Sequence, residues 1–111
     1  MSYTAHDAVI VTVSLDLDGH PDVQAFKRSM PPEYRRLVHG PIPGAINNYV
    51  TWVFAPDGSH KGRPEADAAY EWRRQFIELW EPGRASLVEV RFGGDFGRDH
   101  DPVFTRFMAG P

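Results

Sequence analysis

The fold of this chain is decided by one stretch, Val9–Asp18, which reads VIVTVSLDLD. Every odd position of this stretch carries Val or Leu, and every even position from Thr12 onward carries a polar residue. A period of two sustained over this length predicts a β-strand with one buried face and one largely solvated face. Asp18 and Gly19 are expected to end the strand.

Two helices and a stiff connector are predicted to follow this strand. Pro21–Met30 has apolar residues at helical spacing and ends at two prolines, which cannot continue a helix. A second short helix is expected from Pro32 to about His39. The sequence GPIPG at 40–44 is expected to be an extended connector.

The second half of the chain predicts two further strands around one long helix. Ile46–Phe54 is rich in aromatic and β-branched residues, and because both of its faces are half apolar we expect a central strand. Pro64–Glu81 has the broad apolar face of a helix that packs on a sheet, and Leu87–Phe92 alternates as a strand. Two shorter pairings stay open, one at His60–Gly62 and one, as a short strand or a turn, around Val103–Phe107.

These elements predict a single α+β domain over residues 1–111, with an ordered core at about 8–93 and an irregular C-terminal segment at 94–111. The order β-α-α-β-(β)-α-β fits a two-layer sandwich, in which helices cover one face of a mainly antiparallel sheet of three to four strands. If the segment after Asp57 pairs, the topology becomes the split βαβ arrangement of ferredoxin-like domains.

Composition excludes several classes of protein. The chain has no cysteine, so it has neither a disulfide nor a thiolate metal site. No basic and apolar leader opens it and no apolar run is long enough to cross a membrane, which predicts a cytoplasmic protein without a membrane partner. Its formal net charge of −3 disfavours nucleic acid as a partner. A local basic patch could still form from Lys27, Arg28, Arg35 and Arg36.

A glycine-rich segment gives the alternative hypothesis of an enzyme. The run Arg91–Phe96, which reads RFGGDF, resembles the signature turn of diguanylate cyclases. The resemblance implies nucleotide near the paired glycines and metal on the acidic residue, but Phe96 stands where that family places its glutamate. The simpler interpretation is that Gly93-Gly94 ends a strand in a turn that needs positive φ. The alternative is therefore a small metal- or nucleotide-dependent enzyme that uses segment 91–101.

The same segment holds four residues that could ligate a divalent cation, namely Asp95, Asp99, His100 and Asp101. Carboxylate oxygens with one imidazole suit such an ion. Their spacing matches neither an EF-hand loop nor a two-histidine helix motif, so an ordinary solvated loop is favoured over a metal site. No catalytic residue and no cofactor are predicted.

Arg73 lies near the middle of the apolar face of the predicted helix 64–81. A charge at that place must reach solvent, pair with a carboxylate, or face a ligand or partner. Glu89 and Asp16 are the candidate carboxylates. A structural role at the edge of the core is favoured over a functional one.

Aromatic residues are the remaining signal for function. Tyr49, Trp52, Trp72 and Trp80 are too many to be fully buried in so small a domain, unless they form a two-sided core around a thin sheet. Trp, Tyr and Arg dominate the binding energy of protein interfaces. We therefore predict a partner-binding or self-association surface made of Tyr49, Trp52, Trp72 and Arg73.

Three segments, Tyr49–Ser59, Glu71–Phe76 and Val90–Asp95, together resemble small hypothetical proteins of actinobacteriophages. The resemblance implies a phage-encoded accessory protein that acts in the host cytoplasm by binding a host or phage protein, and it carries no catalytic residues over. Our preferred prediction is accordingly a non-enzymatic protein-binding module, a phage modulator of a host protein, with a homodimer among the assemblies to be tested.

Overall fold

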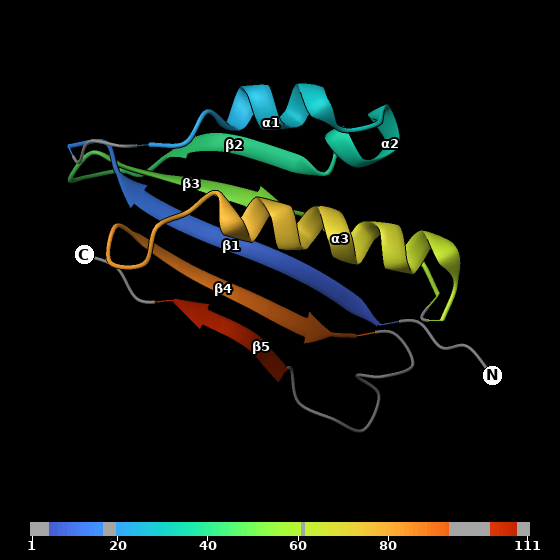
Figure 1. Ribbon diagram of the computed structural model, residues 1–111. Coiled ribbons are helices and arrows are strands. Elements are labelled where there is room, and N and C mark those ends of the chain that lie inside the picture. The colour runs from blue at the N-terminus through green and yellow to red at the C-terminus, as the bar shows by residue number, and fades with distance from the viewer. Residues whose placement is uncertain (1–4, 17–19, 61, 94–102, 109–111) are drawn as a thin grey trace.

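The computed structural model describes residues 5–16, 20–60, 62–93 and 103–108 of the chain (Figure 1). Along the chain the elements are β1 His6–Ser14, α1 Val23–Ser29, α2 Pro32–Arg35, β2 Val38–Pro43, β3 Tyr49–Phe54, α3 Pro64–Glu78, β4 Ala85–Phe92 and β5 Val103–Met108.

The strands form one antiparallel sheet in the order β2-β3-β1-β4-β5. The helices α1 and α3 pack together on one face of this sheet, and in Figure 1 the opposite face carries no helix of the described residues. The predicted α+β sandwich is therefore confirmed. Each helical connection joins two strands that have one strand between them, which is the split βαβ arrangement, and β5 adds a further edge beside β4.

The central strand β1 supplies the middle of the core because its odd positions face the helices. Val9 and Val11 are fully buried, as is Phe54 on the neighbouring strand β3. Phe76 of α3 is equally buried, and its ring meets that of Phe54 edge-on with 5.7 Å between centroids. The buried face that the alternation of β1 predicts is thus the face that the helices cover.

The two short helices are fixed at their ends by side-chain hydrogen bonds. The Asp22 carboxylate accepts a hydrogen bond of 2.9 Å from the backbone N–H of Ala25 and caps α1. Arg35 of α2 donates from Nε to the carbonyl of Lys27 at 3.0 Å and from Nη2 to the carbonyl of Met30 at 2.8 Å. Two of the residues in the predicted basic patch therefore contribute to the contact between α1 and α2.

The edge strand β2 was not predicted. The sequence predicted the end of a helix and an extended connector over the same residues. Val38–Pro43 pairs with β3, with a shift of register in the middle of the strand. At this shift Gly40 has a φ of +142°, and a Cβ added there would lie 2.7 Å from Cε3 of Trp52. A bulge and prolines are features of edge strands, which explains why this segment forms a strand despite its composition.

Other boundaries also differ from the prediction. The strand β1 spans His6–Ser14 rather than 9–18, and β3 begins at Tyr49 rather than residue 46. The start of β3 is set by Asn47 and Asn48, whose φ values of 63° and 55° form a tight hairpin turn. The helix α2 ends at Arg35 rather than residue 39, because the chain there turns into β2.

Among the described residues the sheet has five strands, one more than the upper end of the predicted three to four. The additional strand is β2, whereas in the described part of the segment between β3 and α3 His60 forms an isolated bridge and no strand is present. The C-terminal segment 94–111 was predicted to be irregular, with a short strand or a turn around 103–107. It contains the strand β5, which pairs with β4.

Candidate functional site

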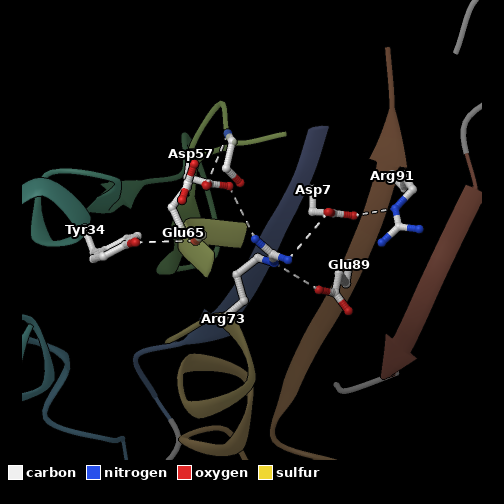
Figure 2. Close-up of polar contacts among 8 residues, drawn as sticks. Asp7, Tyr34, Asp57, Glu65, Arg73, Glu89 and Arg91 are labelled. Carbon is white, nitrogen blue, oxygen red and sulfur yellow. Dashed lines mark hydrogen bonds and ion pairs between the residues drawn. The ribbon is translucent and has the colours of Figure 1, made fainter. Parts of the chain in front are cut away.

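The arginine on the apolar face of α3 is buried at the contact between α3 and the sheet. Arg73 is 2% exposed, and its neighbours on the same face of the helix, Ala69, Phe76 and Ile77, are buried as well. Figure 2 shows its guanidinium between carboxylates from three other segments. The helical period places Arg73 on the buried face of α3, and the negative charges of the surrounding carboxylates offset the cost of removing its guanidinium from water.

Three carboxylates surround this guanidinium. Nη2 donates to Oδ2 of Asp7 on β1 at 3.5 Å, Nε lies 3.4 Å from Oε2 of Glu89 on β4, and Nη1 lies 3.6 Å from Oδ1 of Asp57 in the β3–α3 loop. Asp7 also accepts a hydrogen bond of 2.9 Å from Nε of Arg91. We call these five residues the Arg73 cluster; it holds two cations and three anions.

The contacts that Arg73 itself makes are charge pairings more than hydrogen bonds. Within the described residues, Nε and Nη1 of Arg73 have no hydrogen-bond partner, and their carboxylate distances are too long for good geometry. Of the two predicted partners, Glu89 does pair with Arg73. Asp16 does not: it is exposed and accepts a hydrogen bond from the amide of Asn48 at 3.0 Å. The cluster joins four segments of the chain and leaves no exposed cationic group at Arg73.

A pocket of about 320 Å³ lies beside the Arg73 cluster, with Asp57 common to both. It is formed by α2, the β3–α3 loop and the first turn of α3, and is lined by Glu33, Tyr34, Arg36, Asp57, Gly58, Ser59, His60 and Glu65. The Asp57 carboxylate holds the loop by accepting a hydrogen bond of 3.3 Å from the backbone N–H of Ser59.

The pocket is electronegative around its phenol. Burial raises the pKa of Tyr34 above its ordinary value, and the negative charges of Asp57, Glu33 and Glu65 raise it further. The Tyr34 hydroxyl donates to the backbone carbonyl of Glu65 at 3.4 Å (Figure 2). Such surroundings favour a positively charged group over an anion. No set of three metal-ligating side chains occurs in the described part of the chain, so these carboxylates do not converge on a metal site there.

The face of the sheet opposite the helices has an unusual composition. Its positions in β1, β3 and β4 are His6, Ala8, Ile10, Thr12, Ser14, Tyr49, Thr51, Val53, Ser86, Val88, Val90 and Phe92, and β2 adds His39 and Ile42. We call these residues the open face. None of them is Asp, Glu, Lys or Arg, although 24% of the whole chain is charged. The charged residues of β1 and β4, such as Asp7 and Glu89, lie on the helix side.

Ile10 is at the centre of the open face. It is the middle residue of β1, which is the third of five strands, and it is 42% exposed. Val53 of β3 and Val88 of β4 are its direct cross-strand neighbours, and both are partly exposed. Next to this row, the hydroxyls of Thr12 and Thr51 hydrogen-bond to each other at 2.8 Å. The face therefore has an apolar row at its centre, with neutral polar groups around it.

The four residues predicted to bind a partner do not form one surface. Trp52 and Arg73 are 7% and 2% exposed and belong to the core side. Trp72 is half-buried against Phe26 of α1, whereas Tyr49 lies on the open face. The alternation of β3 already separates Tyr49 from Trp52, since adjacent residues of a strand point to opposite faces.

The residues that the sequence predicts to be functional do not include Ile10, Val53 or Val88. One signal was present: Ile10 is the single apolar residue at the even positions of 9–18, where Thr, Ser and Asp otherwise stand. The predicted metal ligands Asp95, Asp99, His100 and Asp101 lie outside the described residues, and so does the second half of the diguanylate-cyclase-like run, residues 94–96. Its first glycine, Gly93, has a φ of +68°, which fits a strand that ends in a turn.

Among the described residues no helix is long and apolar enough to cross a membrane. No protein-family model matches this chain, and neither does any curated protein or any solved structure. The candidate function therefore rests on the geometry of the Arg73 cluster, the pocket and the open face.

Proposed function

We propose that this chain is a non-enzymatic protein-binding module that binds its partner through the open face. One observation carries the proposal: the open face has no charged residue at any described position and has Ile10 exposed at its centre. An antiparallel sheet with one solvated face normally carries polar and charged residues on that face. The centres of protein interfaces, in contrast, are depleted of charge.

The open face is large enough for a specific interface. The five strands hold 9, 6, 6, 8 and 6 residues, so at about 3.3 Å a residue and about 4.8 Å a strand one face of the sheet covers roughly 550 Å². A specific interface of standard size buries about 800 Å² on each partner. A partner that covered the whole face would therefore bury an area of the right order.

The chemistry of the face also selects the class of partner. A sheet that binds RNA offers stacking aromatics together with basic residues for the phosphates, and the open face has neither Lys nor Arg at its described positions. An uncharged and partly apolar protein surface is complementary to it. In the phage setting that the sequence resemblance implies, this face would bind a protein of the host or of the phage.

A photo-reactive amino acid placed at one position at a time tests the proposal. At position 10 of the full chain it should cross-link a defined protein in cells, with the cross-linked peptide mapped by mass spectrometry. The matched control is position 70, since Tyr70 is similarly exposed, at 53%, but lies on α3 away from the open face. If position 10 captures no protein, or only the same proteins as position 70, the proposal is wrong.

A further inference from the structure

We propose that the open face binds the open face of a second copy of this chain, so that two sheets pack face to face in a symmetric dimer. The inference rests on the proposed function, and it names the partner. It is argued from the central position of Ile10, from the absence of charge on the face and from the size of the face.

The central position of Ile10 makes the open face complementary to itself. In a dimer with a two-fold axis, the same patch of both copies forms the interface. With the axis between the sheets and passing over Ile10, Ile10 of one copy meets Ile10 of the other. This holds whether the axis runs along β1 or across it. In both cases Val53 and Val88, which flank Ile10, meet valines of the second copy.

The absence of charge removes the main obstacle to self-association. Two-fold symmetry places groups near the axis opposite the same groups of the second copy. On a charged face, like charges would therefore meet and repel each other. The described positions of the open face carry no such charge. The polar groups next to the central row are also partly satisfied inside one copy, because Thr12 and Thr51 already hydrogen-bond to each other. Covering them therefore costs less than covering free hydroxyls.

The packing of two such sheets has a well-defined geometry. Stacked sheets lie about 10 Å apart, with interdigitated side chains between them. The exposed Ile10 and the partly exposed Val53 and Val88 are aliphatic side chains of a suitable size to fill that layer. The helices of each copy would then lie on the outside of the dimer, because in each copy they cover the other face of the sheet.

The dimer is tested first by the mass of the purified full chain, using sedimentation equilibrium and light scattering after gel filtration over about 1–200 µM. The expected mass of the wild type is twice 12.6 kDa. Ile10→Lys should return the mass to one chain, with an unchanged circular dichroism spectrum because the side chain is 42% exposed. Tyr70→Lys places the same charge on α3 and should leave the dimer intact.

A second variant tests the dimer without placing a charge in the sheet. The chain has no cysteine, so Ile10→Cys carries one thiol. With the sheets about 10 Å apart the two thiols face each other, too far apart for a direct disulfide but within reach of a short bifunctional maleimide. Treatment with such a cross-linker at low protein concentration should convert most of the chain to a covalent dimer, whereas Tyr70→Cys should stay monomeric.

The outcomes separate the two proposals. A monomeric wild type over the whole concentration range, or equal cross-linking of the two cysteine variants, overturns the dimer. If a photo-reactive residue at position 10 still captures another protein, the proposed function stands and only the identity of the partner is wrong. If it captures nothing, both proposals fall.

Discussion

Replacing Arg73 with methionine should destabilise the domain strongly, because it removes the cation from the middle of the Arg73 cluster. The buried carboxylates of Asp57 and Glu89 would each lose this counter-charge, and each is only 11% exposed. Breaking a buried ion pair by removal of one partner costs about 3–5 kcal/mol. The contacts of Arg73 are 3.4–3.6 Å long, so we expect a loss near the lower limit, about 3 kcal/mol.

The measurement is the free energy of unfolding in urea, followed by tryptophan fluorescence, since Trp52 and Trp80 are buried. The matched control is Arg74→Met on the same helix. Arg74 is 36% exposed and pairs with Glu71 and Glu78 at the surface, so its replacement should cost less than about 1 kcal/mol. Methionine preserves most of the aliphatic bulk in both variants.

Adding Glu89→Gln to Arg73→Met should recover part of the loss, because it removes one of the negative charges that Arg73 faces in the wild type. The reasoning is refuted if Arg73→Met costs no more than Arg74→Met.

Three further predictions follow from the core, the edge strand and the pocket. Phe76→Ala should cost about 3–5 kcal/mol in urea unfolding, because its fully buried ring packs against three other aromatic rings; a loss below about 1 kcal/mol would contradict this packing. Gly40→Ala should lower the melting temperature, since its Cβ would collide with the Trp52 ring at a φ of +142°, whereas Gly58→Ala, which has a positive φ but open space, should lower it less. Tyr34 should titrate above the ordinary pKa of tyrosine in an ultraviolet difference titration, and Glu33→Gln should move that pKa down because it removes one of the charges that raise it. The folded chain holds this phenol proton more tightly than the unfolded chain, so the stability that Tyr34 contributes is lost as the pH rises through its raised pKa. An unchanged pKa of Tyr34 in the Glu33→Gln variant would argue against an electronegative pocket.

The parts of the fold that follow from local sequence could be predicted. The alternation in Val9–Asp18 identified both the strand and the face that the helices cover, because burial on one side imposes a period of two. The apolar face of α3 was predicted for the same reason at helical period. The edge strand β2 could not be predicted in this way, since the composition of Val38–Pro43 is that of a connector. It is a strand only because β3 lies beside it.

The candidate site shows the same division between local and non-local information. The helix period placed Arg73 inside and made Glu89 a candidate partner. The other two carboxylates, Asp7 and Asp57, were not predicted, because one precedes the predicted start of β1 and the other lies in a turn. The composition of the open face could not be predicted either, since it depends on which strands lie beside β1 and in what register. Ile10 gained its significance only when β1 proved to be the middle strand.

The central place of β1 in the sheet has a consequence for how the chain folds during synthesis. Of the described strands it is the first along the chain, yet Val11 pairs with Trp52 on one side and with Leu87 on the other. Until β3 and then β4 emerge, both edges of an apolar strand have no partner in the chain, and unpaired edges of this kind promote aggregation. Nascent chains that stop before β4 should therefore depend on chaperones, and the domain should form in one late and cooperative step.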